Sequence, residues 1–429
     1  MQGVGSAPCS SLFKRAVDIS SAHQPASAGA LLRRPGYLAY WSARFFATFA
    51  VQIVSVSIGW QIYDLTRDPL ALGLVGLVQF LPSLLLVLVT GSVADRFNRR
   101  TILILCLAAE LVCVAVLAGL TLSSSREAWP IFAALLGPGI ARAFIGPAVQ
   151  SLLPNVVTAR ELPTAIAWNS SAWQIATIIG PVAGGLLYGL SATVAYGMSG
   201  VLLAAVLLAT MITIVRPQEP GEPASWSTVI AGFDYVWRHK ILLGAISLDL
   251  FAVLLGGAVA LMPVYARDIL NVGPWGLGLL RAGPGIGAVL VVVYLSLRPI
   301  RDHAGVIMFV SVGAFGLFTT IFGVSTAPWL SVLMLVLMGA SDMVSVYVRE
   351  TLIQLATPDE VRGRVNAVNM VFIGASNELG EFRAGVSAAV IGVVPAVVVG
   401  GLGTLAITLL WARLFPSLRE ARHLSGRPA

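Results

Sequence analysis

Ionisable side chains stand inside stretches of this sequence that are otherwise apolar. They are Glu110, Arg142, Asp249, Arg281, Asp342, Glu378, Glu381 and Arg383. A carboxylate can take up and release a proton, and a guanidinium group can neutralise a carboxylate or bind an anion. Because a charge in apolar surroundings is costly unless it is paired, each of these residues is a candidate for proton or ligand binding.

The stretches that position them are long enough to be membrane-spanning helices. A helix needs about 20 residues to cross ~30 Å of hydrocarbon, and the alternation typical of barrel strands is absent. The chain is 57% hydrophobic and 11% charged, which is too apolar for a water-soluble protein. The apolar stretches cover residues 37–63, 70–90, 101–121, 129–153, 163–188, 193–214, 241–266, 276–296, 305–325, 328–350, 364–392 and 394–414. We predict an all-α membrane protein with twelve transmembrane helices in a lipid bilayer.

The basic residues of the loops predict the orientation. Cytoplasmic loops accumulate Lys and Arg, and if both termini are cytoplasmic, only Arg67, Arg126 and Arg267 lie in loops on the opposite side. The net charge of +7 therefore requires no nucleic-acid partner. Residues 1–35 lack the apolar core of a signal peptide, so we expect a disordered cytoplasmic tail there, with a second tail at 416–429.

The cysteines and histidines indicate no metal site and no cofactor. Cys106 and Cys113 are two helical turns apart, ~10 Å, which is too far for a disulfide, and Cys9 lies in the tail. All four histidines fall outside the predicted spans, so proton transfer within the membrane has to use carboxylates. The sequence has no GxxxxGK loop, which argues against direct use of ATP.

The two halves of the chain resemble each other at a shift of 200 residues. Arg142 then falls on Asp342, and Gly180 falls on Gly380. We predict two six-helix halves, residues 36–214 and 241–415, joined by a cytoplasmic linker at 215–240. Two such halves with a site at their interface are typical of alternating-access transporters.

From about residue 36 to 415 the sequence resembles the major facilitator superfamily. The resemblance rests on GSVADRFNRR at 91–100, with Asn98 where Gly is usual, and on the strings at 59–82 and 357–382. The two strings resemble the branch that contains the bacterial enterobactin exporter. The superfamily motif in 91–100 is carried by Gly91, Asp95, Arg96, Arg99 and Arg100.

In that superfamily, the resemblance implies, this loop latches the two halves together on the cytoplasmic face. Asp95 would face the N-terminal end of the helix at 364–392, where unpaired N–H groups and the helix dipole favour an anion. Arg96 and Arg99 would complete the charge network. The alternative is that the arginines only fix the membrane topology. That alternative does not explain Asp95, because topology alone does not require an acidic residue there.

A second superfamily pattern lies in the span at 163–188. It consists of Gly180, Pro181, Gly184 and Gly185. It resembles the pattern typical of proton-driven exporters, because small residues allow close helix packing and the proline permits a bend. The alternative is helix packing with no part in coupling.

Arg142 and Asp342 are the most informative of the ionisable residues because they occupy equivalent positions in the two halves. We expect them to face each other across a central cavity. Arg142 also stands four residues before Gly146, and the resemblance associates such an arginine with proton coupling. The alternative is a permanent buried ion pair that only fixes the helices.

The remaining candidates leave alternatives open. Asp249 has no opposite charge within a turn of its own helix, so it could carry a proton, contact a cationic substrate or lie near lipid headgroups. Glu378 is deeper in its helix and is a further proton-coupling candidate. The predicted substrate-cavity residues are Trp173, Asn369, Glu381 and Arg383. Tryptophan also favours membrane interfaces, and Glu381 and Arg383 could instead be a structural pair.

The pattern as a whole favours a proton-coupled exporter of a siderophore or similar small metabolite, in which small-molecule substrate and protons bind alternately. A broad-range multidrug efflux transporter is the alternative, and a non-transporting receptor or scaffold is a remote one. An enzyme is disfavoured because no paired histidines and no serine with a base stand together. We expect a monomer in the bacterial cytoplasmic (inner) membrane.

Overall fold

The computed structural model describes residues 31, 33, 35–96, 98–123, 126–158, 161–212, 226–300 and 302–421. Most of the two predicted tails and the first part of the predicted linker lie outside these ranges.

Eleven of the twelve predicted spans are continuous helices, apart from end residues, wherever the structure describes them, and the span predicted at 241–266 is interrupted. The first six are α3 (Pro35–Thr66), α4 (Pro69–Arg96), α5 (Arg99–Leu122), α6 (Trp129–Val156), α7 (Leu162–Leu190) and α8 (Ala192–Ile212). The linker contributes α9 (Trp226–Arg238). The later spans are α10 (Lys240–Gly256), α12 (Gly273–Leu297), α13 (Ala304–Val324), α14 (Pro328–Ala356), α15 (Asp359–Ile391) and α16 (Val393–Leu414), and α17 (Pro416–Arg419) follows them.

Single residues in two short connections explain where one helix begins and where another ends. The side chain of Asn98 accepts a hydrogen bond of 3.0 Å from the backbone N–H of Arg100, so Asn98 caps α5. Its φ of −62° is not the left-handed turn that glycine would supply, and capping explains the asparagine instead. Gly392 has a φ of +89°, a conformation that favours glycine, and it separates α15 from α16.

Eleven helices of the described part are long and apolar enough to cross a membrane. The one predicted span that is not among these eleven is α15. It has 33 residues, which is long enough to cross a membrane, but its first turns and its centre are polar. The charged residues near its centre are Glu378, Glu381 and Arg383. Charges in a span cost free energy unless protein or water surrounds them, so α15 is the helix on which a site is expected.

The span predicted at 241–266 is not one continuous helix. After α10 ends at Gly256, the chain forms a 3₁₀ turn η1 (Val259–Leu261), the short α11 (Met262–Val264) and a π turn η2 (Tyr265–Ile269). Consecutive glycines at 256 and 257 weaken the helix, and Pro263 cannot donate a backbone hydrogen bond. The interruption brings Arg267 and Asp268 to the end of the bundle.

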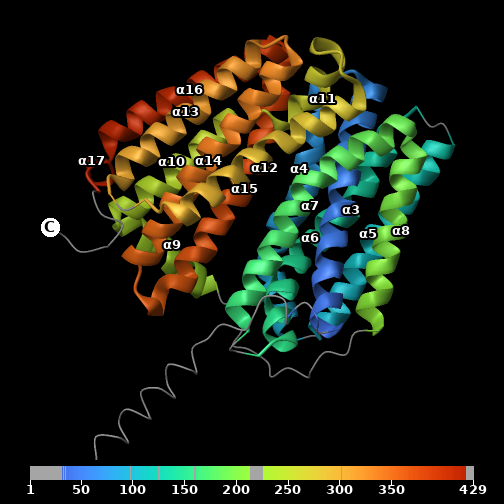
Figure 1. Ribbon diagram of the computed structural model, residues 1–429, viewed down its shortest axis with the longest axis horizontal. Helices are drawn as coiled ribbons and strands as arrows, with labels where there is room; N and C mark the ends of the chain where they lie inside the picture. The colour runs from blue at the N-terminus through green and yellow to red at the C-terminus, as the bar shows by residue number, and fades with distance from the viewer. Residues whose placement is uncertain are drawn as a thin grey trace, which may run out of the picture.

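The helices gather into two bundles, α3–α8 and α10–α16, which lie side by side in Figure 1. The bundles touch where α7 packs on α12 and α4 packs on α15. Both contacts are close because they use glycine: a Cβ on Gly73 would lie 3.0 Å from the carbonyl oxygen of Phe382, and one on Gly278 would lie 2.5 Å from that of Pro181.

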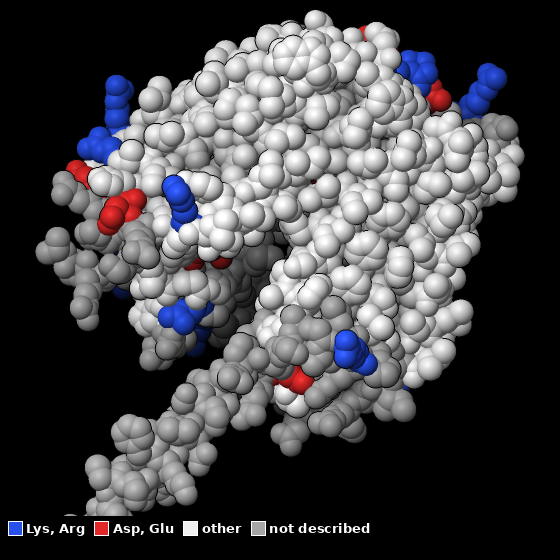
Figure 2. All heavy atoms as spheres, viewed as in Figure 1, with Lys and Arg blue, Asp and Glu red and all other residues white. Residues whose placement is uncertain are grey.

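The two ends of the molecule differ in how closely the bundles meet. At the end where α3 meets α4, here called the Asp64 face, Val56 and Trp60 join a buried apolar cluster with Leu261, Tyr265 and Leu277 of the other bundle. At the opposite end, the α9 face, a hollow separates the bundles (Figure 2). The broad surface between the two ends is almost free of blue and red in Figure 2, as expected for a membrane-facing belt.

Candidate functional site

A cavity of about 310 Å³ lies between the two bundles. Six helices, α3, α4, α6 and α7 of one bundle and α12 and α15 of the other, supply its walls together with the turn η1. The polar residues that line it are Gln52, Ser55, Gln79, Arg142, Thr177, Arg281, Glu378 and Glu381. A polar cavity at the interface of two helical bundles is the place where transporters bind their substrates.

Arg142 of α6 reaches across the cavity to the other bundle. Its Nη1 donates to Oε1 of Glu378 on α15 at 3.1 Å, and its Nη2 donates to Oε1 of Gln79 at 3.4 Å. The prediction that Arg142 faces Asp342 is therefore wrong, because Glu378 is its carboxylate partner. Positions related by the internal repeat lie at equivalent places in their own bundles, which does not bring them into contact.

Glu378 and Glu381 lie one turn apart on α15 and converge on Gly76 of α4. A Cβ on Gly76 would lie 3.2 Å from Oε2 of Glu378 and 3.1 Å from Oε2 of Glu381. Both carboxylates thus approach the same bare stretch of α4 backbone. The absence of a side chain at Gly76 creates the space that holds the two acids together.

Arg281 of α12 lines the same cavity from the other bundle. Its Nη1 donates to the hydroxyl oxygen of Ser55 on α3 at 2.7 Å, and its Nε is buried without a hydrogen-bond partner within the described residues. Glu381 lines the same cavity. Arg281, one of the ionisable residues singled out in the sequence, thus lies in the cavity wall.

A second charged cluster lies within the later bundle. Arg349 of α14 forms a salt bridge with Asp249 of α10, and the two side chains are 2% and 9% exposed. Asp342 is close enough for its charge to interact with both. Asp249 has no opposite charge within a turn of its own helix, and its partner comes from another helix. Asn369 is also in this region, since its Nδ2 donates to Glu350 Oε1 at 2.8 Å.

Three of the predicted substrate-cavity residues are not among the residues that line the cavity. Asn369 is 2% exposed and bonded to Glu350 as described. Arg383 points to α10, where its Nη2 donates to the carbonyl oxygen of Leu255 at the interrupted helix end. Trp173 is 47% exposed, one turn before Thr177. Glu381 alone of the four lies in the cavity wall.

The small residues of α7 pack against two different helices. A Cβ on Gly184 would lie 3.0 Å from Cα of Ile53 on α3, and one on Gly185 would lie 3.1 Å from Cα of Trp275 on α12. Gly180 faces α3 in the same way as Gly184, and Pro181 lines the cavity. The pattern thus lies where α3, α7 and α12 meet, and its part in coupling stays a prediction.

The predicted latch falls mainly on side chains outside the described residues. For Gly91, Asp95, Arg96 and Arg99 the structure describes the backbone only. The exception is Arg100, whose guanidinium donates to the carbonyl oxygens of Thr210 at 3.1 Å and of Met211. Both carbonyls end α8 of the same bundle, so Arg100 caps α8. The latch between the bundles stays a prediction.

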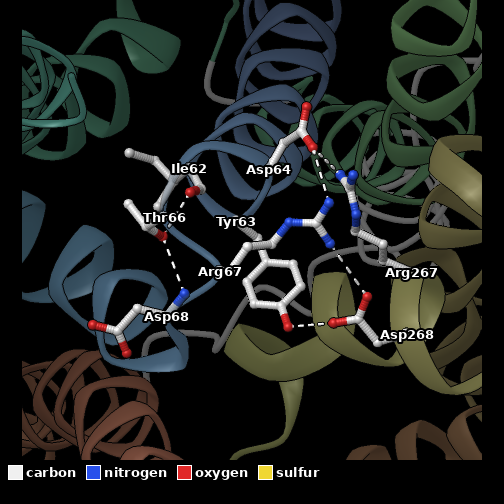
Figure 3. A network of polar contacts seen from close by, with 8 residues as sticks. All are labelled: Ile62, Tyr63, Asp64, Thr66, Arg67, Asp68, Arg267 and Asp268. Carbon is white, nitrogen blue, oxygen red and sulfur yellow. Dashed lines mark hydrogen bonds and ion pairs between the residues drawn. The ribbon is translucent and has the colours of Figure 1, made fainter. Parts of the chain in front are cut away.

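A network of charges joins the two bundles at the Asp64 face (Figure 3). Asp64 of α3 forms a salt bridge with Arg267, and Arg67 lies 3.5 Å from Asp268 Oδ1. The hydroxyl of Tyr63 donates to Asp268. Each bundle contributes one acid and one arginine, so the arrangement is reciprocal and closes the cavity from this side.

Sequence reasoning missed two parts of this arrangement. Arg349 was overlooked because the predicted span ended at residue 350, whereas α14 continues to Ala356 and buries the arginine. The Asp64-face network was overlooked because Asp64 and Arg67 stand at a helix end, where charged residues are common. The sequence did carry a signal for it, because 64–67 and 267–268 each contain one aspartate and one arginine.

Solved transporter structures share this fold. A bacterial homologue of the human lysosomal transporter Spinster, in an inward-facing and unoccupied conformation, matches with a TM-score of 0.70 at 14% identity, covering 90% of this chain and 99% of that one. A bacterial homologue of the iron transporter ferroportin in an inward-facing state matches with a TM-score of 0.66 at 15% identity, covering 90% and 98%. These likenesses show that the chain has the fold of the major facilitator class, with a cavity between two helical bundles.

The chain belongs to the transmembrane secretion effector family, whose model matches residues 26–426. The enterobactin exporter EntS of Citrobacter koseri is 25% identical over 408 residues, covering 92% of this chain and 95% of that relative. EntS of Escherichia coli O1:K1 is 25% identical over 406 residues with the same coverage. The predicted superfamily and branch are confirmed, and the chain is an integral membrane transporter.

Proposed function

We propose that this transporter exports a siderophore or a similar small polar metabolite in exchange for protons. The observation that carries the proposal is the glutamate pair Glu378 and Glu381, held in the cavity between the bundles with Arg142 of the opposite bundle on one carboxylate. The membrane is the bacterial cytoplasmic membrane, the α9 face is cytoplasmic, and both termini are expected on the cytoplasmic side. The basic residues of that side support this orientation.

The glutamate pair provides a site that a proton and a substrate can occupy in turn. Two nearby carboxylates repel each other when both are charged, and a proton on one of them removes the repulsion. A hydroxyl group of a substrate would use the same carboxylate oxygens as acceptors. Proton and substrate therefore exclude each other at this site, which is the condition for antiport.

Arg142 links the state of the glutamate pair to the position of the bundles. Its contact with Glu378 at 3.1 Å joins α6 to α15, and it is broken when the bundles separate. Loss of the guanidinium removes the charge that favours ionised Glu378, so movement of the bundles changes proton affinity. In this scheme residues 36–214 and 241–415 move as two units, and the Asp95 latch closes the cytoplasmic side.

The cavity wall favours a polar substrate over a broad range of apolar drugs. Its lining carries two arginines and two glutamates and no aromatic side chain among the described residues. Broad drug binding relies on adaptable apolar and aromatic surfaces. The names of the EntS relatives support a siderophore as the substrate class.

Transport into inverted membrane vesicles tests the proposal. Vesicles acidified inside should accumulate enterobactin, and an uncoupler should abolish the accumulation. A sodium requirement, or equal uptake without a proton gradient, would refute antiport with protons. Accumulation of unrelated apolar drugs in place of enterobactin would favour the multidrug alternative.

A further inference from the structure

Arg281 carries hydrogen-bonding capacity that the protein leaves unused. A guanidinium group has five N–H donors and no acceptor. One hydrogen bond is made, to the neutral hydroxyl of Ser55 at 2.7 Å, and the buried Nε has no partner within the described residues. The Nη2 group also makes no hydrogen bond within the described residues and, unlike Nε, it is not closed off from the cavity. A ligand in the cavity that supplies an acceptor can therefore bind at Nη2, where a hydrogen bond to a charged donor is favourable.

Glu381 is the complementary group in the same cavity. Its carboxylate lies against the bare backbone of Gly76, and the residue lines the cavity together with Arg281. Among the described residues no ion pair within 4.0 Å joins Arg281 to Glu381, in contrast to the 3.1 Å contact of Arg142 with Glu378. The cavity therefore presents free donors on one wall and free acceptors on another.

We propose that Arg281 and Glu381 form a subsite for a ligand group that carries a hydroxyl beside an oxygen acceptor, as catechols and hydroxamates do. The acceptor oxygen receives hydrogen bonds from Arg281, and the hydroxyl donates to Glu381. This subsite rests on the proposed function and names the chemical group that the transported molecule has to carry.

The signs of the surrounding charges disfavour simpler ligands. A carboxylate placed at Arg281 would be repelled by Glu381 and Glu378. An ammonium group placed at Glu381 would be repelled by Arg281 and Arg142. A neutral group with a donor and an acceptor side by side can form hydrogen bonds with both Glu381 and Arg281, and it adds no buried charge.

Binding of small aromatic probes to the purified full-length protein in lipid nanodiscs tests the subsite. The probes are 2,3-dihydroxybenzamide, 2,3-dimethoxybenzamide, benzoate and benzylamine, and calorimetry measures each affinity. We expect the dihydroxy probe to bind, and the other three to bind about tenfold to a hundredfold more weakly, the range expected for lost hydrogen bonds to charged groups. Absence of binding by the dihydroxy probe, or equal binding by the dimethoxy probe, would overturn the subsite.

Variants assign the effect to the two residues. Arg281→Gln and Glu381→Gln should each weaken the dihydroxy probe by about tenfold, whereas Arg238→Gln, on the exposed side of α9, should leave its affinity unchanged. Unchanged affinity in both cavity variants would refute the subsite. If Arg281→Gln does not fold, the probe comparison on the native protein still decides. Proton-driven uptake that persists while the subsite fails would leave the proposed function standing.

Discussion

Two arginine–carboxylate pairs in this molecule differ in their exposure and in the bundles that they join. Arg142 is 51% exposed at its side chain, and its contact with Glu378 joins opposite bundles. Arg349 is 2% exposed, and its contact with Asp249 lies within one bundle. A pair that bridges two moving bodies can separate during transport, whereas a pair enclosed in one bundle separates only if the bundle unfolds. The first is expected to affect coupling and the second stability.

Neutral substitution of the glutamate pair should uncouple transport from the proton gradient. In Glu378→Gln or Glu381→Gln no proton can be exchanged at that side chain, so gradient-driven uptake should fall at least about tenfold while exchange of substrate across the membrane persists. Uptake and counterflow in the same proteoliposomes separate the two activities. Asp234→Asn on α9 is the matched control, and coupled uptake at the native rate in both glutamate variants would contradict the antiport scheme.

Removing Arg349 should destabilise the protein. Arg349→Met leaves Asp249 charged and buried without its partner, which costs about 3–5 kcal/mol. The double variant Arg349→Met with Asp249→Leu removes both charges and should recover much of the thermal stability. Melting temperatures of the purified proteins measure the effect. If the single variant were as stable as the native protein, the pair would not be a structural one.

At the scale of elements, the contact of α7 with α12 closes the Asp64 face. Gly185 lies at this contact and leaves no space for a side chain, because a Cβ there would meet the α12 backbone. Gly189 on the same helix has nothing within 4 Å of its Cβ position. The two glycines therefore differ in surroundings while sharing a helix, and they make a matched pair of sites.

A large side chain at Gly185 should hold the Asp64 face open. Gly185→Leu should abolish transport and expose a cysteine at Val259, which lines the cavity, to an impermeant reagent added on the Asp64 side. Gly189→Leu should label and transport like the native protein. Labelling is done in a protein without the native cysteines. Normal transport by Gly185→Leu would show that transport does not require the close contact of α7 with α12.

Two further elements, the end of α3 and the π turn η2, are joined by the charge network at the Asp64 face. Asp64→Asn removes one partner of Arg267, and exposed pairs are worth about 0.2–1 kcal/mol. We therefore expect a shift toward the open state of less than about tenfold, seen as faster labelling of Val259→Cys. Asp64→Arg with Arg267→Asp should restore slow labelling, and a failure of this exchange would mean that packing alone closes the face.

At the scale of the whole molecule, closure at the Asp64 face accompanies separation at the α9 face (Figures 1 and 2). The opposite state requires a contact at the α9 face, and the Asp95 latch is the predicted one. Asp95→Asn should lower transport sharply with a normal amount of protein in the membrane, because insertion does not need the carboxylate. Transport assays and immunoblots of membranes measure both, and native transport by the variant would reduce the loop to a topology signal.

The sequence predicted the helices well because apolar length decides where a span lies. It also predicted Arg142, Glu378 and Glu381 as functional candidates, because charge inside a span is conspicuous. It did not predict which of them meet. Contact depends on how each helix is rotated against its neighbours, and a repeat relates Arg142 to Asp342 without placing them together. The break after Gly256 was missed because its residues are as apolar as the helix before them.

The charge network at the Asp64 face meets water, and this makes it sensitive to dissolved ions. The side chains of Asp64 and Arg67 are 47% and 53% exposed, so salt in the adjoining solution screens them. The screening length falls from about 10 Å at 0.1 M to about 3 Å at 1 M ionic strength. Salt added on that side alone should ease opening of the face, whereas the same salt on the α9 side should leave it unchanged. In the proposed orientation the Asp64 face meets the outside of the cell, so the salinity of the medium would adjust how easily this face opens.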